Sequence, residues 1–127
     1  MTVGLSTYMA NAYLDAACNA TAFSVATMYA KLHIGDPGAA GASNVATETT
    51  RKAVSFGAAA SGSVTNDVAV TWTNIAGSQD ATHVSLWDAA AAGNFLGSGT
   101  ITANAYVAGD TYDIAIGGIV LSFPVAA

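Results

Sequence analysis

The feature that most constrains the fold is the stretch Ala26–Gly38, in which apolar and polar residues alternate before a turn. A period of two predicts a β-strand with one buried face and one exposed face. Pro37 fixes φ and lacks an amide hydrogen, and glycines tolerate positive φ, so the strand should end in a structural turn. The apolar positions are Met28, Ala30, Leu32 and Ile34; the polar ones are Thr27, Tyr29, Lys31 and His33; the turn is Gly35, Asp36, Pro37 and Gly38.

Similar alternating runs recur along the rest of the chain. They fall at residues 52–56, 67–73, 82–87, 95–101, 112–116 and 119–123. Gly97 and Gly99 interrupt the run at 95–101, which predicts a bulge or a close backbone contact there. Residues 5–19 instead have apolar side chains at three- and four-residue steps, which predicts a helix. Its apolar face would consist of Leu5, Tyr8, Met9, Ala12, Tyr13 and Ala16. We therefore expect one domain, residues 1–127, built as an antiparallel β-sandwich or flattened barrel of about 7–8 strands. The N-terminal helix would span residues 5–19, and residues 39–50 would form a surface loop.

The composition narrows the possible partners. Charged residues make up 9 % of the chain, with a net charge of −5 and three basic residues. This basic content is too small to neutralise the phosphates of a nucleic acid or to favour an anionic membrane surface. No apolar run reaches the roughly 18–20 residues that a membrane span needs. A surface with so few charges gives little protection against association, so we expect a homo-oligomer or a multi-copy assembly.

The residues that could carry chemistry lack the partners they would need. No serine lies in a G-x-S-x-G elbow, and both His33 and His83 fall on the outward side of predicted strands. No pair of His, Cys or Glu has metal-ligand spacing, and Cys18 is the single cysteine. We therefore predict no enzyme activity, no metal and no cofactor. Four acidic residues occupy turn-like or outward positions where structural roles are expected: Asp80, Asp88, Asp110 and Asp113.

The outward sides of two predicted strands carry aromatic and histidine side chains. These candidate contact residues are Tyr29, His33, His83 and Trp87. Exposed aromatic rings can stack on sugars, which makes a carbohydrate-binding module one alternative. Partner contact or cross-strand pairing is the other, and we favour it.

Several stretches resemble a family of small structural proteins from tailed bacteriophages. The most specific is Lys31–Gly41, KLHIGDPGAAG, which contains the pattern L-H-x-G-D-P-G. Residues 5–16 resemble the helix of these proteins, and residues 51–56, 82–88 and 108–123 resemble their later segments. Members are described as minor capsid or decoration proteins, minor tail proteins or tail-fibre proteins. The resemblance implies a virion structural protein and supplies no catalytic residues.

The position in the virion has to be argued from the chain itself. It lacks the long repetitive shaft of a fibre, so we expect a capsid decoration protein that binds the head exterior, with the major capsid protein as its partner. The alternative is a minor tail or tail-fibre protein that joins other tail proteins and contacts the host surface. Met1–Met9 has no secretory signal, so synthesis in the host bacterial cytoplasm is expected. The loop at residues 39–50 would contact the partner.

Overall fold

The computed structural model describes residues 3–126. Within them the chain forms one α-helix and eight β-strands. The elements are α1 (Thr7–Cys18), β1 (Met28–His33), β2 (Lys52–Val54), β3 (Ser63–Thr65), β4 (Val70–Trp72), β5 (Gln79–Trp87), β6 (Phe95–Tyr106), β7 (Tyr112–Ile114) and β8 (Val120–Ser122).

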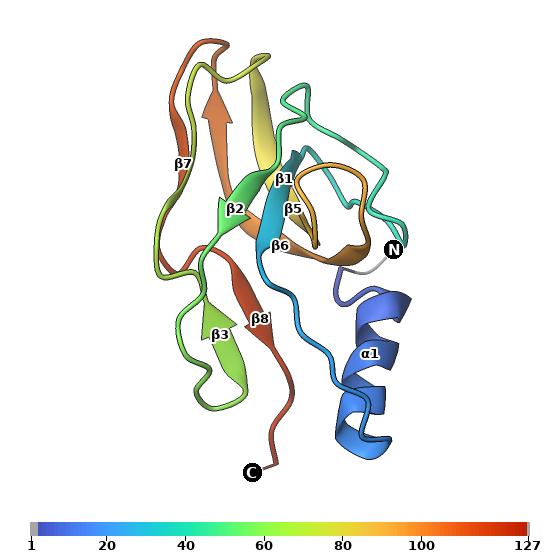
Figure 1. Cartoon of the computed structure of the whole chain (residues 1–127). Helices are drawn as coiled ribbons and strands as arrows, with labels where there is room; N and C mark the ends of the chain where they lie inside the picture. The colour runs from blue at the N-terminus through green and yellow to red at the C-terminus, as the bar shows by residue number, and fades with distance from the viewer. Residues whose placement is uncertain (1–2, 127) are drawn as a thin grey trace.

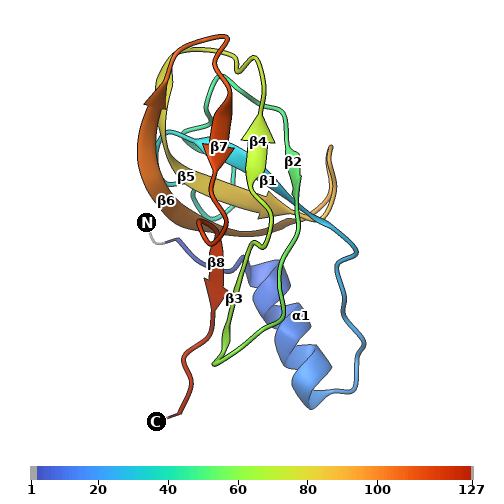
Figure 2. The same ribbon diagram turned by 90° about the vertical axis from the view of Figure 1, so that its left-hand side faces the viewer.

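The strands form one larger sheet and two smaller pairs, all antiparallel. The larger sheet has the order β2-β1-β5-β6, and the pairs are β4–β7 and β3–β8. The β4–β7 pair lies across one face of the larger sheet (Figure 2), whereas α1 and the β3–β8 pair lie together at the lower end (Figure 1). The predicted mainly β sandwich with an N-terminal helix is therefore confirmed, and the barrel is not closed.

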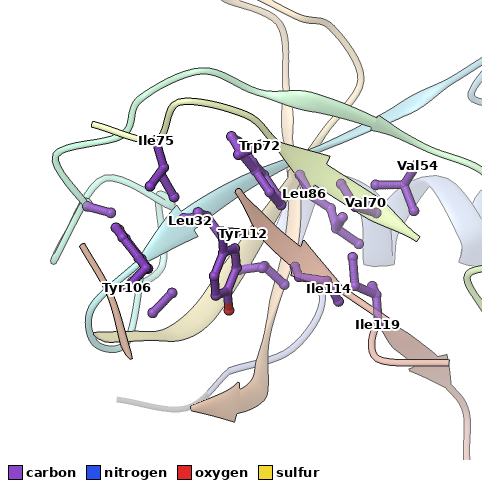
Figure 3. Packing of buried hydrophobic residues seen from close by; sticks show 14 of the residues in the cluster. Leu32, Val54, Val70, Trp72, Ile75, Leu86, Tyr106, Tyr112, Ile114 and Ile119 are labelled. Atoms are coloured by element: carbon purple, nitrogen blue, oxygen red, sulfur yellow. The ribbon is translucent and has the colours of Figure 1, made fainter. Parts of the chain in front are cut away.

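The hydrophobic core fills the space between the larger sheet and the β4–β7 pair (Figure 3). Leu32 on β1 and Leu86 on β5 face Trp72 on β4 and Tyr112 on β7, and all four side chains are buried. The indole Nε1 of Trp72 donates to the carbonyl of Thr50 at 2.9 Å, so its one polar atom is satisfied inside the core. The alternation of period two at β1, β4, β5 and β7 sets these inward positions.

Strand β6 makes the close backbone contact that its glycines predict. The pairing of β5 with β6 shifts register between Leu86 and Trp87. The N-terminal segment crosses the edge of β6 there, and the amide of Ser98 donates to the carbonyl of Gly4 at 2.8 Å. A Cβ at Gly97 would lie 2.9 Å from that carbonyl oxygen, so only glycine allows this approach.

Helix α1 begins at a satisfied cap but buries little of its surface. The hydroxyl of Ser6 accepts from the amide of Met9 at 3.0 Å, as an N-cap should. Met9 is the buried residue of the helix. The predicted apolar face also included Tyr8 and Ala16, and both are exposed, so that part of the prediction is wrong. The helix leans on the edge of β6 and leaves most of its surface open.

Candidate assembly surface

His33 is buried, so the prediction that it is an exposed contact residue is wrong. Its exposed fraction is 0 %, because the loop that follows β1 folds back over the outer face of the sheet. Its Nδ1 lies 2.8 Å from the carbonyl oxygen of Ser43, and its Nε2 lies 2.7 Å from Oγ of Ser85. The prediction that Ile34 lies on the buried face of the strand is also wrong, because this residue follows the end of β1 and is exposed.

Serine and histidine are in contact here, but the arrangement is not a catalytic one. Ser85 is as fully buried as His33, so no substrate can reach its hydroxyl. The second ring nitrogen of His33 faces a backbone carbonyl, where a catalytic triad would place a carboxylate. The pair therefore belongs to the structure of the sheet and its loop.

Neighbouring side chains pack against the indole ring of Trp87, so the ring is not free to stack on a sugar. The guanidinium of Arg51 lies 3.9 Å from the centre of its ring, and the ring of Phe95 packs at 5.4 Å. Arg51 also donates through Nη1 to the carbonyls of Ala89 and Ala92, at 2.9 and 2.6 Å. Arg51 thus connects the turn after β5 to the sheet, and Trp87 packs against the guanidinium that makes this connection.

The other two candidate contact residues are partly buried. Tyr29 pairs directly with Trp87 across β1 and β5, which is the cross-strand arrangement that was favoured. His83 contacts the hydroxyl of the neighbouring Thr82 through Nδ1 at 2.8 Å. Tyr29, His83 and Trp87 are all partly buried, so they do not form a row of exposed aromatic rings.

The turn after β1 has the local chemistry that its sequence predicts. Oδ1 of Asp36 accepts from the amide of Gly38 at 2.8 Å, and Gly38 has a φ of 78°. The amide group of Asn44 donates to the carbonyl of Asp36 at 2.9 Å and closes the far side of the turn. Pro37 and Gly38 are buried beneath it. A structural role is therefore visible, whereas an interface role for the turn stays a prediction.

The loop at residues 39–50 is held against the domain by its own contacts. Gly41 has a φ of 67° and sits so close to Phe95 that a Cβ there would lie 2.6 Å from the ring. Ala46 is buried, and the carboxylate of Glu48 accepts from the amides of Thr50 and Ala76 at 3.1 and 3.2 Å. Burial raises the pKa of Glu48, but these hydrogen bonds outweigh it and the net pKa is lowered.

The predicted structural roles of the acidic residues are confirmed at three of the four positions. Asp88 accepts from the backbone and side-chain amides of Asn94, at 2.7 and 2.9 Å, which lowers its pKa. Asp110 accepts from the amide of Val107 at 3.0 Å, and Asp113 from the hydroxyl of Thr71 at 2.5 Å. The fourth acidic residue, Asp80, is exposed on β5.

An open apolar surface lies where sequence reasoning did not place a site. Large apolar side chains gather on α1, the N-terminal segment and the end of β8, and we call this the assembly face. Leu14 on α1 is 63 % exposed and Phe123 after β8 is 52 % exposed. The exposed members of the assembly face are Val3, Tyr8, Leu14, Val120, Phe123 and Val125.

A groove of about 590 Å³ runs through the assembly face. Strand β8 lines it, with Ser98–Thr100 of β6 and Tyr13 of α1. The ring of Tyr13 packs edge-on against Phe23 and Phe123 at 5.5 and 5.4 Å, which ties the helix to the segment after it and to the C-terminal end. None of the described residues lining the groove is charged.

The sequence contains one sign of the assembly face, which is the lack of charged residues in two segments. Residues 3–14 and 114–126 contain no Asp, Glu, Lys or Arg, although both segments reach the surface. Periodicity placed Tyr8 on the apolar face of the helix and Phe123 in the last alternating run, but a pattern cannot show whether such a face meets the domain or solvent.

Other site types are not found in residues 3–126. No group of three or more His, Cys, Asp and Glu side chains could hold a metal ion. In the same residues, no helix combines the length and the apolar character that crossing a membrane requires. Cys18 is exposed at the end of α1.

A family comparison identifies the type of protein that carries this surface. Residues 4–122 match the model of the family described as podophage GP4 fiber I protein gp80. The chain belongs to this family. It is therefore related to a structural component of phage virions, and contact with other phage structural proteins follows at that level. A comparison with curated proteins gives no match.

Proposed function

We propose that this protein is a structural subunit of a podophage virion fibre that attaches to another virion protein through the assembly face. The family description supports the fibre, and the open apolar surface on α1 and β8 supports the attachment site. The single observation that carries the proposal is the exposure of Val3, Val120 and Phe123 along an uncharged groove.

The energetics favour a partner on this face. Exposed apolar groups of this kind mark interaction sites when they gather in one patch. Covering a side chain such as Leu14 or Phe123 contributes about 1.5–3 kcal/mol, so the few residues of the assembly face supply a useful interface. A 12-residue helix is also marginal in water by itself, and α1 gains one buried residue from the domain. Binding to a partner would bury the surface of α1 that is exposed in the single chain.

The test replaces an apolar side chain of the assembly face by an acidic one. We expect Val120→Asp, at an exposed position that lines the groove, to lower incorporation into virions at least about tenfold, because burying an unpaired charge in an interface costs several kcal/mol. Phage particles lacking the wild-type protein would be complemented with the variant, purified and measured by quantitative mass spectrometry. Circular dichroism of the free variant would show that it folds.

Val107→Asp is the matched control. Val107 is 62 % exposed in the turn between β6 and β7, which lies at the opposite end of the molecule from α1 (Figure 1). It should enter virions at the wild-type level. Normal incorporation of Val120→Asp, or an equal loss for both variants, would contradict the proposal.

The position in the virion needs a separate measurement. Capsid decoration stays a prediction, and the family description favours the alternative of a fibre protein. Antibody labelling of intact virions in the electron microscope distinguishes them. Label at the tail would support the fibre subunit, and label spread over the head would replace it with the decoration role.

A further inference from the structure

The β3–β8 pair, which lies at the lower end of the molecule (Figure 1), directs half of the backbone groups of β8 away from β3. In an antiparallel pair, alternate residues bond to the partner strand, and the residues between them point both backbone groups outward. The amide of Phe123 donates to the carbonyl of Gly62 at 2.8 Å. The carbonyl of Ile119 accepts from the amide of Asn66 at 3.2 Å. The odd-numbered positions of β8 therefore face β3, and the even-numbered ones face the outer edge.

The chain covers the outer edge of β3 but leaves the outer edge of β8 open. The amide of Ser63 donates to the carbonyl of Ala60 at 3.0 Å, and its carbonyl accepts from the amide of Ala60 at 2.9 Å. The even-numbered residues of β8 are Val120 and Ser122. Within residues 3–126, no hydrogen bond reaches the N–H or the C=O of either residue. These groups are free donors and acceptors in the single chain.

This open edge borders the groove of the assembly face. Val120 and Ser122 line the groove, together with Leu5 and with Tyr13 of α1. An exposed strand edge is a template for a further strand, and proteins commonly protect such an edge with a lysine, a proline or a bulge. Strand β8, with the sequence Val-Leu-Ser, carries no lysine and no proline. Because the N–H and C=O groups inside a helix bond to each other, a helix cannot use this edge, whereas an extended chain can.

The groove specifies the kind of segment that fits. Its volume is about 590 Å³, and none of the described residues lining it is charged, so a charged side chain would find no partner there. The N-terminal segment and α1 line the groove opposite β8, which leaves room for one extended chain. Strand β8 of a second copy would carry β3 on its other edge and would bring two strands into the same space.

We propose that the groove receives a single extended, uncharged segment of another virion protein, which adds to the open edge of β8 as a third strand. The N–H and C=O groups of Val120 and Ser122 supply the backbone bonds, and the exposed ring of Phe123 contacts its side chains. The chain already makes such a contact at β6, where the backbone of Gly4 and Ser6 bonds to the strand edge. The inference rests on the proposed function, because it names what the partner presents to the assembly face.

Ser122→Pro tests the added strand, since it removes one donor of the open edge and none of the bonds between β8 and β3. Proline lacks the N–H, and an edge strand tolerates it where that N–H faces solvent. We expect incorporation into virions to fall at least about fivefold, because a carbonyl of the added strand would be buried without its donor. Complementation and quantitative mass spectrometry measure this as for Val120→Asp, and circular dichroism of the free variant would show that it folds.

Ser122→Ala is the matched control, because it keeps the N–H and should enter virions at the wild-type level. Normal incorporation of Ser122→Pro, with a loss for Val120→Asp, would overturn the added strand and leave the assembly face as an attachment site. Normal incorporation of both variants would refute the proposed function itself. An equal loss for Ser122→Ala and Ser122→Pro would assign the effect to the hydroxyl and would also overturn the added strand.

Hydrogen exchange of the wild-type protein gives a test that needs no variant. The amides of Val120 and Ser122 should exchange at least about tenfold more slowly in intact virions than in the free subunit, because strand addition protects them. Exchange at the same rate in both would overturn the proposal. Light scattering of the purified subunit should give the mass of a single chain. A dimer that Ser122→Pro converts into a monomer would identify a second copy as the occupant and refute the strand of another protein.

Discussion

Asn66 shows how much of the fold a single buried amide can hold. Its Nδ2 donates to the carbonyls of Val68 and Ala115, both at 3.0 Å. Its Oδ1 accepts from the amide of Ile119 at 2.9 Å. These bonds join the link between β3 and β4 to the link between β7 and β8, which lie far apart in the sequence. Without them, three backbone groups would lose partners in a buried site.

We predict that Asn66→Ala destabilises the protein by about 2–4 kcal/mol. Each buried polar group left without a partner costs about 1–3 kcal/mol, and partial access of water reduces the sum. Urea unfolding followed by fluorescence measures the change. Asn104→Ala, at an exposed position on β6, is the control and should change stability by less than about 0.5 kcal/mol. Equal losses of stability in the two variants would contradict a stabilising role for the hydrogen bonds of Asn66.

At the scale of elements, α1 depends on local capping more than on burial. Ser6 satisfies the amide of Met9, and the amide of Ser6 itself donates to the carbonyl of Leu96 on β6 at 2.8 Å. The cap residue thus both starts the helix and fixes its first turn to the sheet. The rest of α1 is connected through the edge-on contacts of Tyr13 with Phe23 and Phe123.

Replacing the cap should loosen α1 before it affects the sandwich. We predict that Ser6→Ala costs about 1 kcal/mol and raises amide exchange in the first turn of α1 roughly fivefold. Hydrogen exchange measured by mass spectrometry follows the helix and the strands separately. Ser6→Asp, which retains a capping oxygen, should restore protection. Loss of protection in β5 at the same time would mean that α1 and the sandwich unfold as one unit.

At the scale of the whole molecule, stability should decline with acid in two separate ranges. His33 has a lowered pKa in the folded state, so below pH 6.5 the unfolded chain binds a proton that the folded chain does not. Glu48 and Asp88 also have lowered pKa values, and their contributions are complete above the ordinary carboxyl range and disappear below it. The first loss therefore begins near pH 6.5 and the second below about pH 4.5.

Urea midpoints measured from pH 7 to pH 3 test these ranges. His33→Gln should remove the decline between pH 6.5 and 5, and Glu48→Gln should reduce the decline below pH 4.5. Each variant is the control for the other, because the two side chains titrate in different ranges. A wild-type midpoint that is constant from pH 7 to pH 5 would contradict the contribution of His33.

The sequence by itself determined most of the strands and many of their inward faces, although β3 (Ser63–Thr65) is not among the alternating runs. Alternation at Leu32, Val84, Leu86 and Ile114 reports burial directly, because successive side chains in a strand point to opposite faces. The turn after β1 was also readable, since Asp, Pro and Gly impose their own backbone geometry. These features depend on neighbours in the chain.

Tertiary structure alone decided what covers each outward face. His33 and Trp87 occupy outward positions on their strands, yet the loop after β1 covers the first and Arg51 the second. Tyr8 and Leu14 lie on a helix whose apolar residues meet solvent. Alternation shows which way a side chain points, but burial depends on segments distant in sequence. For that reason most of the strands could be predicted from the chain, whereas the burial of His33 and the assembly face required the fold.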